Sequence, residues 1–305
     1  MNIIETENLT KRFGETIAVD NISISIGEKE IYGFLGLNGA GKTTTIRLLL
    51  KMIKADYGSF LLFGQHVKQA SYIWNDVGYM VETPHSYPEL TVTENLEIFY
   101  RLRGLNEEIL IHNIIDKLQL TQYKDRKVKH LSLGNKQRLG LAKVLMHKPK
   151  LLILDEPTNG LDPAGIVEVR ELLKELVNDF NTTIFISSHI LSEIAKLATR
   201  IGIVHEGKLI KEIDIDDLEK QIIKKLRLNT GNNQKAYEIL QANGIDIITK
   251  GDVLLETSDQ DSIKYPEKIA ALLSNSGIPP KMLYVFEEDL ESYFLRTIGR
   301  KPAEP

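Results

Sequence analysis

The chain contains no cysteine and no long uninterrupted apolar segment. Without cysteine, disulfide cross-links and thiolate metal sites are excluded, which fits a reducing compartment. The longest apolar stretch, residues 46–53, contains Arg47 and Lys51 and falls far short of the ~18 residues that a membrane-spanning helix needs. We therefore expect any contact with a membrane to be made through another protein.

An excess of positive charge is also missing, because the 305 residues carry a formal net charge of -4. The chain as a whole supplies no cationic field for a phosphate backbone, which argues against nucleic acid as the main partner and leaves only a local basic patch open. Hydrophobic residues make up 42% and charged residues 26% of the sequence, which is typical of a globular protein with a substantial core. The length allows one large domain and one smaller domain.

The start of the chain alternates between β-type and helical patterns. Residues 3–6 and the strictly alternating residues 21–26 predict half-buried antiparallel strands. A short apolar strand at residues 31–35 leads into a glycine-rich turn, and helical spacing follows over residues 42–53. This part therefore combines a small β layer with a strand-loop-helix unit.

The middle of the chain, residues 90–120, is charged and has helical spacing. Thr91 or Thr93 is placed to cap the start, with Glu94 in the first turn. We predict a helical insertion here.

Parallel strands follow the insertion. Residues 151–154 and 183–187 are short apolar runs that each precede a helical segment, which is the pattern of βαβ units. Residues 201–213 close the sheet as two strands around a turn. We predict an α/β core with an antiparallel β subdomain and a helical insertion in residues 1–215, and a small α+β domain in residues 220–305.

Residues 36–43, Gly-Leu-Asn-Gly-Ala-Gly-Lys-Thr, fit the phosphate-binding loop in its expected place between a strand and a helix. The glycines allow the backbone to curl so that N–H groups face phosphate oxygens, helped by the positive end of the helix dipole. We expect Lys42 to reach the terminal phosphates as a catalytic residue and Thr43 to bind magnesium. The alternative is a glycine-rich helix cap without a ligand. The residues expected to contact the nucleotide are Gly36, Asn38, Gly39, Ala40, Gly41, Lys42, Thr43 and Thr44.

Two adjacent carboxylates, Asp155 and Glu156, end the apolar strand at residues 151–154. Asp155 is placed to hold magnesium, and Glu156 to accept a hydrogen bond from an attacking water and orient it. Acidic pairs at strand ends also occur as solvated charges at a helix start, which is the alternative.

One histidine stands apart from the other six. His189 follows the strand at residues 183–187, where ligands of open α/β sheets gather, and is a candidate for contacting the terminal phosphate. The alternative is a surface or satisfied core residue, and we assign that role to the remaining histidines.

Residues 131–138, Leu-Ser-Leu-Gly-Asn-Lys-Gln-Arg, look like the signature motif of ATP-binding-cassette (ABC) proteins. The phosphate loop, this motif, the acidic strand, residues 159–162 and Ser188-His189 follow one another in the order of that family, over residues 1–215. The resemblance implies a P-loop NTPase core of the ABC ATPase type that binds ATP and Mg²⁺ and hydrolyses ATP.

The same resemblance implies a head-to-tail homodimer. In it, Ser132 and Gly134 of one copy clamp the ATP held on the phosphate loop of the other, and Asp162 lies in the loop that links the two sites. Phe13 matches the aromatic residue that stacks on adenine; its alternative is a core position in a strand. Glu82 stands where the family usually has a glutamine that senses magnesium and the membrane partner, and it remains a possible metal ligand.

Residues 82–84 with Tyr87, residues 90–96, residues 136–140 and the acidic helix at 287–294 resemble the ATP-binding subunits of bacitracin and lantibiotic resistance exporters. The resemblance implies a subunit held at the cytoplasmic face of the cell membrane by a separate transmembrane permease. The alternative is a soluble ABC ATPase of translation or DNA repair, but those proteins usually join two cassettes or insert long coiled coils, which this sequence lacks. The C-terminal domain is either a regulatory or dimer-contacting module or a packing appendage.

Overall fold

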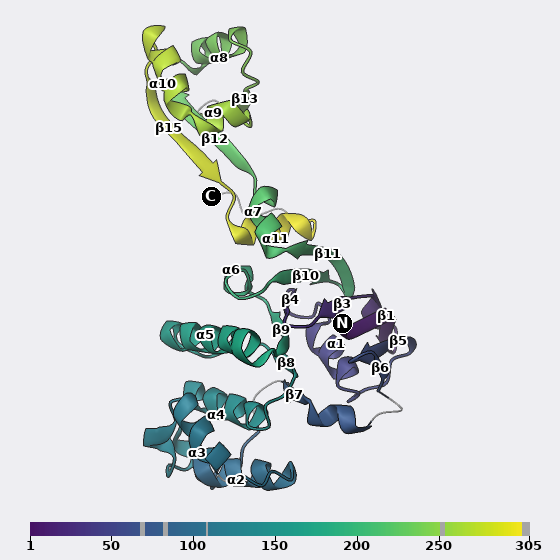
Figure 1. Cartoon of the computed structure of the whole chain (residues 1–305). Coiled ribbons are helices and arrows are strands. Elements are labelled where there is room, and N and C mark those ends of the chain that lie inside the picture. The colour runs from purple at the N-terminus through teal and green to yellow at the C-terminus, as the bar shows by residue number, and fades with distance from the viewer. Residues whose placement is uncertain (68–70, 82–84, 108, 251–253, 301–305) are drawn as a thin grey trace. The chain divides into compact units, whose positions relative to one another are not determined.

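The computed structural model describes residues 1–67, 71–81, 85–107, 109–250 and 254–300. The chain divides into two compact units, Met1–Asp217 and Leu218–Pro305, and each is described by itself (Figure 1). Across the described ranges, every helix is too short or too polar to cross a membrane.

An antiparallel sheet opens the first unit. Its strands are β1 (Asn2–Phe13), β2 (Thr16–Ile22), β3 (Ser25–Gly27), β5 (Tyr57–Leu62) and β6 (Gln65–His66). β1 pairs with β2, β3 and β5, and β6 extends the sheet from β5. The predicted β layer is present, with two later strands that the sequence patterns did not indicate.

One predicted strand, over residues 21–26, is interrupted. Its isoleucines are buried in alternation as expected, but the strand breaks between Ile22 and Ser25. The Thr6 hydroxyl donates to Ile22 O (3.0 Å) and accepts from the N–H of Ile24 (2.9 Å). The Thr6 side chain therefore supplies two of the partners at the break, while its backbone N–H donates to Ile24 O (2.9 Å).

A second sheet forms the centre of the unit, and within the described residues its strand order is β11-β10-β4-β9-β8-β7. The strands are β4 (Ile31–Leu35), β7 (Val77–Met80), β8 (Leu151–Asp155), β9 (Thr183–Ser188), β10 (Arg200–His205) and β11 (Lys208–Asp214). Neighbours are parallel except for the antiparallel edge strand β11. β4, β8 and β9 are buried throughout, as expected of parallel strands covered on both faces. Their carboxyl ends meet at one edge of the sheet.

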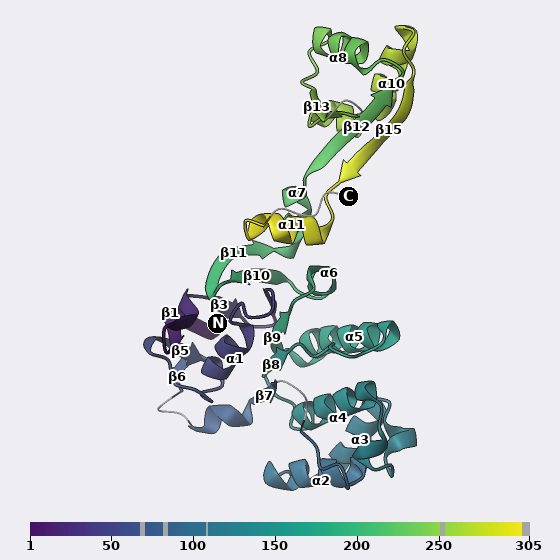
Figure 2. The ribbon, with the colours of Figure 1, turned by 180° about the vertical axis from the view of Figure 1, so that it is seen from behind.

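Helices cover both faces of the central sheet. α1 (Lys42–Leu49) lies on one face and α5 (Pro163–Phe180) on the other (Figures 1 and 2). Ile46 of α1 enters a core that also contains residues of the antiparallel sheet and Phe185 of β9. Phe185 stacks on Tyr32 with ring centroids 5.9 Å apart. The core thus joins the two sheets through α1.

The helix predicted over residues 42–53 is shorter in the structure. α1 ends at Leu49, and Lys51 adopts a left-handed conformation (φ 56°) that stops a helix. Ile53, which completed the apolar stripe in the sequence, packs against the same core from the turn that follows. The spacing therefore predicted burial correctly and helix length wrongly.

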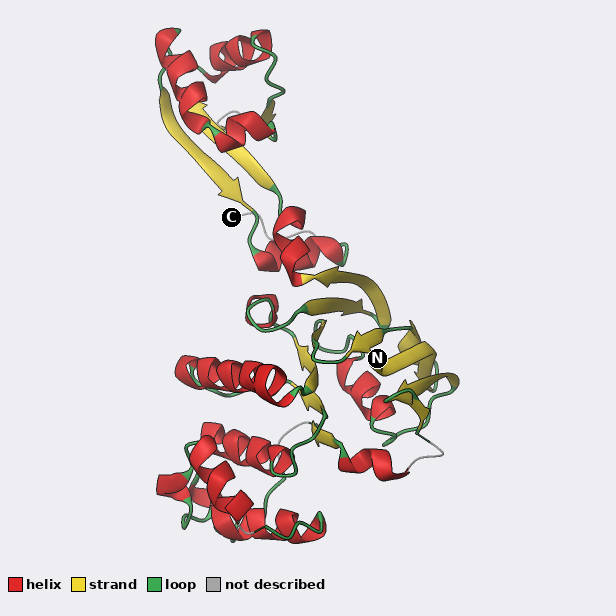
Figure 3. Ribbon diagram, viewed as in Figure 1, coloured by secondary structure: helices red, strands yellow, loops and turns green. Residues whose placement is uncertain are grey.

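The predicted helical insertion consists of α2 (Val92–Leu102) and α3 (Ile109–Lys117), which pack with α4 (Leu133–Leu145) (Figure 3). Thr91 caps α2. Its hydroxyl accepts from the N–H of Glu94 (3.2 Å), and the Glu94 carboxylate accepts from the N–H of Thr91 (2.7 Å). This reciprocal capping box satisfies two backbone donors at the helix start and confirms the predicted cap.

Replacing Thr91 by alanine is expected to lower the free energy of unfolding by about 1 kcal/mol, because one backbone donor at the start of α2 loses its partner. Urea denaturation followed by circular dichroism measures the loss. Thr91→Ser keeps the hydroxyl and is the matched control, which we expect to stay near the wild-type value. Equal losses in both variants would show that the cap is not the cause.

The second unit is a sheet with helices. Among its described residues, the strand order is β13-β14-β12-β15, and all pairs are antiparallel. The strands are β12 (Lys224–Thr230), β13 (Ile248–Lys250), β14 (Leu254–Thr257) and β15 (Pro280–Glu287). The helices are α8 (Asn233–Ala242), α9 (Gln260–Lys264), α10 (Pro266–Asn275) and α11 (Leu290–Thr297), with α7 (Ile215–Gln221) at the junction of the two units. The sequence around residues 250–252 predicts a hairpin, and β13 and β14 do pair antiparallel, although Gly251 and Asp252 lie outside the described residues.

Candidate functional site

The glycine-rich loop connects β4 to α1 and wraps around a lysine. Lys42 is the first residue of α1 and is buried, and its Nζ donates to the carbonyl oxygens of Gly36 (2.7 Å) and Leu37 (3.3 Å). Gly41 has a φ of 103°, and a Cβ there would lie 2.4 Å from Ala18 O, so only glycine fits. The loop therefore holds a buried cation at a helix N-terminus, which is an arrangement suited to an anion such as a phosphate.

The other loop residues differ in exposure. Asn38 and Gly39 are exposed, Thr44 is half-buried, and Ala40 is buried. Gly36, at the start of the loop, donates its N–H to Ser188 O (3.2 Å) at the end of β9. The loop is thus joined to the neighbouring strand end.

Asp155, at the end of β8, is buried and accepts two hydrogen bonds. Its Oδ2 accepts from the Thr43 hydroxyl (2.7 Å) and its Oδ1 from the Ser187 hydroxyl (2.5 Å). These hydroxyl and carboxylate oxygens are the donors that magnesium prefers. The described residues contain no cluster of three or more histidine, cysteine or acidic side chains. The donor set fits an ion shared with phosphate oxygens rather than an all-protein cage.

Glu156 follows Asp155 with a left-handed backbone (φ 48°), which is uncommon for a residue other than glycine. Its N–H donates to the Ser187 hydroxyl (3.0 Å), which helps to hold this conformation. The Glu156 carboxylate lies 3.2 Å from Lys42 Nζ and 3.0 Å from His189 Nδ1, and accepts from Asn159 Nδ2 (2.5 Å). The three predicted catalytic residues, Lys42, Glu156 and His189, therefore form one cluster.

The cluster keeps Glu156 ionised. Burial favours the neutral acid and works to raise the pKa of Glu156, but the hydrogen bond and charge of Lys42, with His189 and Asn159, hold that pKa below its usual range. An ionised carboxylate accepts hydrogen bonds and donates none. It can therefore orient a water molecule by accepting a hydrogen bond from it.

Asn159 and Ser187 are site residues that the sequence did not indicate as such. Ser187 is the register partner of Asp155 in the parallel pair of β8 and β9, so the strand alignment contained a signal for it. Asn159 reaches Glu156 through the turn that follows the strand, and no spacing in the sequence signals that contact.

Ser132 and Asp162 lie at exposed helix starts, and Gly134 is half-buried in the first turn of α4. Ser132 caps α4 by accepting from the N–H of Asn135 (3.3 Å), and Asp162 caps α5 by accepting from the N–H of Gly165 (2.9 Å). Gly134 lies beside the Leu161 side chain. Ser132 and Asp162 are nevertheless exposed, so another molecule can contact them.

Of the two remaining predicted site residues, Phe13 is described by the structure and Glu82 is not. Phe13 ends β1 and exposes 53% of its surface, with Lys11 Nζ 5.4 Å from its ring. This exposure excludes the alternative that Phe13 is a core residue. Glu82, the third predicted magnesium ligand, lies outside the described residues.

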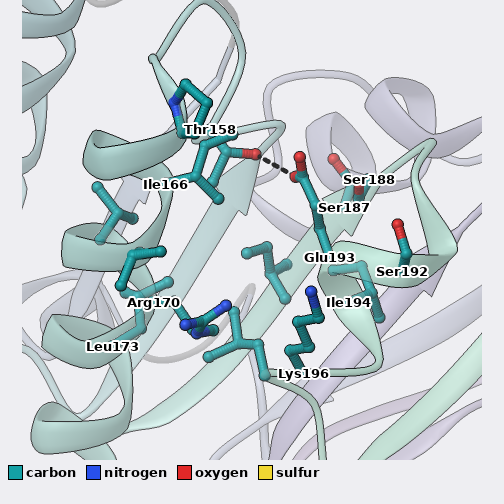
Figure 4. A pocket seen from close by; sticks show the side chains of 15 residues that line it. Thr158, Ile166, Arg170, Leu173, Ser187, Ser188, Ser192, Glu193, Ile194 and Lys196 are labelled. Atoms are coloured by element: carbon teal, nitrogen blue, oxygen red, sulfur yellow. Dashed lines mark hydrogen bonds between the residues drawn. The ribbon is translucent and has the colours of Figure 1, made fainter.

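Two hollows lie near the cluster, and one of them is lined by Glu156 itself. One, of about 350 Å³, is lined by Thr43, Leu133, Gln137, Asp155, Glu156, Asn159 and Gly160. The other, of about 260 Å³, lies between α5 and α6 (Leu191–Ile194), and there Thr158 donates its hydroxyl to Glu193 (3.0 Å) (Figure 4). The first hollow is lined by the carboxylates of Asp155 and Glu156, whereas the second contains the hydrogen bond that connects the loop after Glu156 to α6.

The chain is similar to known transport ATP-binding proteins. A family model described as ABC transporter matches residues 19–159. The bacitracin transport ATP-binding protein BcrA of Bacillus licheniformis is 41% identical, covering 97% of both chains. The lantibiotic transport ATP-binding protein SrtF of Streptococcus pyogenes is 38% identical over 71% of this chain and 93% of its own length.

Solved structures are similar to about 72% of the chain. The ATP-binding subunit of an ABC transporter matches with a TM-score of 0.65 at 26% identity, over 72% of this chain and 92% of that one. An ATP-binding cassette of an ABC transporter in its ADP conformation matches with a TM-score of 0.64 at 26% identity, over 72% and 94%. These matches confirm the predicted fold class.

Proposed function

The chain belongs to the ABC transporter family as an ATP-binding and ATP-hydrolysing subunit, and from this premise we propose that it powers an exporter giving resistance to bacitracin-type or lantibiotic-type peptides. The observation that carries the proposal is the similarity to bacitracin transport subunits over nearly the whole chain, which includes the C-terminal unit. The alternative of an ATPase in translation or DNA repair is not favoured, because these relatives are transport subunits.

The proposed roles follow from the cluster. Lys42 and the loop residues bind the phosphates of ATP, while Thr43 and Asp155 hold Mg²⁺, whose charge, when the ion is bound, offsets that of the phosphates. Glu156 orients the attacking water, and His189 contacts the terminal phosphate. Lys42 Nζ lies 3.2 Å from the Glu156 carboxylate and forms an ion pair with it. A phosphate that takes over Lys42 would release the Glu156 carboxylate to accept from a water.

The subunit arrangement is also proposed. Two copies meet head to tail, so that the exposed Ser132 and the half-buried Gly134 of one close over the ATP on the phosphate loop of the other, with Phe13 on the adenine and Asp162 between the sites. The openness of the α4 start and of Phe13 supports this arrangement. We further propose that the helical insertion contacts the permease at the cytoplasmic face of the membrane.

We propose residues 1–215 as the nucleotide-binding domain and 220–305 as an accessory domain. The division of the structure into units that meet at Asp217 and Leu218 supports this assignment.

The function is tested by expressing the chain together with a transmembrane permease of the bacitracin-exporter type in a bacitracin-sensitive bacterium. We expect the minimal inhibitory concentration of bacitracin or of a lantibiotic to rise severalfold, and the Glu156→Gln variant to abolish that rise. Unchanged sensitivity to both peptide classes, with the permease inserted and the ATPase active, would contradict the proposal.

A further inference from the structure

The sheet of the second unit has two edges of different length. β13, at one edge, has three residues, whereas β15, at the other, has eight (Figure 3). Met282, Tyr284 and Val285 of β15 each expose about 40% of their surface. A long apolar edge is a template for another strand, and proteins usually protect it with lysine or proline. In β15 those residues stand only at the start, as Pro280 and Lys281, so the middle of the edge is left open.

The ladder between β12 and β15 shows which backbone groups face this edge. Glu288 donates its N–H to Ile223 O (2.8 Å) just beyond the last ladder pair. Antiparallel pairs alternate between hydrogen-bonded and non-hydrogen-bonded positions. Tyr284, an even number of residues from Glu288, therefore directs its N–H and C=O toward β12. Leu283 and Val285 direct theirs to the open edge.

The sequence of β15 is complementary to itself in an antiparallel pair centred on Tyr284. The facing pairs in this register are Leu283 with Val285, Met282 with Phe286, and Lys281 with Glu287, each in both directions. Leu283 and Val285 direct their backbone N–H and C=O groups to the open edge, so they form a hydrogen-bonded pair. The two Tyr284 residues face each other at a non-hydrogen-bonded position, where side chains lie close together.

Charge selects this register over its neighbours. Centring on Tyr284 places Lys281 opposite Glu287 at both ends of the pair. Moving the centre to Leu283 places Lys281 opposite Val285, and moving it to Val285 places Glu287 opposite Leu283. Opposite charges across a strand pair stabilise it, whereas a charge facing an apolar side chain gains nothing.

We propose that two copies of this chain pair through β15, antiparallel about Tyr284, so that their sheets join into one. The strand edge is small for a stable interface, and we expect the contact to be weak in isolation. Copies already held together by their nucleotide-binding domains would form it at a raised effective concentration. The contact itself needs no nucleotide, so its failure would leave the proposed ATPase function untouched.

The absence of cysteine makes disulfide trapping a direct test. Tyr284→Cys in the full chain places two thiols at a non-hydrogen-bonded pair, where the ~4.5 Å between Cα atoms fits a disulfide. Under mild oxidation without nucleotide, we expect a covalent dimer to form at least about tenfold faster than with Met282→Cys, whose thiols face Phe286 instead of each other. Equal rates for the two variants, with unchanged circular dichroism, would overturn the proposal.

An exchange of charges tests the register without relying on the rate of oxidation. Lys281→Glu sets a second glutamate against Glu287, and Glu287→Lys sets two lysines against each other, so each variant alone is expected to lose the contact. Mixed together, the two variants restore opposite charges at both ends of the pair. In the Tyr284→Cys background with two affinity tags, we expect mixed disulfide dimers to predominate. Because Glu287 also lies 3.2 Å from Lys224 Nζ, its variant is checked for folding by thermal melting. A random distribution of dimers from two folded variants would contradict the register.

Discussion

Replacing Glu156 by glutamine is expected to lower ATP turnover by about 10²- to 10⁴-fold while ATP binding is kept. The amide nearly matches the carboxylate in shape, but it lacks the negative charge, and its NH2 group donates hydrogen bonds where the carboxylate oxygen accepts them. It also no longer forms an ion pair with Lys42, whose Nζ lies 3.2 Å from the carboxylate in the wild type. Lys42 then has no competing carboxylate and keeps only its hydrogen bonds to Gly36 and Leu37, so affinity for ATP is expected to stay equal or to rise.

Single-turnover hydrolysis and binding of a fluorescent ATP analogue separate the two effects. Glu171→Gln makes the same chemical change on an exposed glutamate of α5 and serves as the control, which should keep wild-type turnover. The lowered pKa keeps Glu156 ionised through the neutral range, so the defect should not depend on pH between about 6 and 8. Near-normal turnover in Glu156→Gln would rule out Glu156 as the group that orients the water.

The centre of the site could be predicted because its residues stand at the ends of short buried strands. Parallel strands that neighbour one another bring their carboxyl ends to one edge of a sheet, so Asp155, Glu156 and His189 had to come near the phosphate loop. The apolar strand before each of them is visible in the sequence. Local pattern and sheet geometry together were sufficient for these residues.

Other features depend on contacts between distant residues. The Thr6 hydroxyl breaks a strand whose alternation is regular, and nothing near residues 21–26 signals it. The bond from Asn159 to Glu156 depends on the left-handed turn at Glu156, which propensity does not favour. The open edge of β15 appears only when the strand order is known. In each case the sequence shows the residue but not its partner.

Removing the Lys42 side chain is expected to weaken ATP binding more than the loss of one bond explains. A hydrogen bond to a charged group contributes about 1.5–3 kcal/mol, which corresponds to roughly 10- to 100-fold in affinity. In Lys42→Ala the Glu156 carboxylate also loses the cation that lies 3.2 Å away and faces the incoming phosphates as a like charge. Lys54→Ala removes the same charge from an exposed position after α1 and should bind ATP normally.

The double variant separates these two causes. If the unpaired Glu156 carboxylate repels ATP, Lys42→Ala/Glu156→Gln should bind ATP more tightly than Lys42→Ala alone, although a second residue of the site has been changed. The coupling of two residues in contact is what a double-mutant cycle measures, and about 0.5–3 kcal/mol is usual. Isothermal titration calorimetry on the wild type, the two single variants and the double variant measures this coupling energy directly. An affinity in the double variant equal to or below that of Lys42→Ala would mean that Glu156 does not face the phosphates, and the assignment of both residues to one nucleotide site would be wrong.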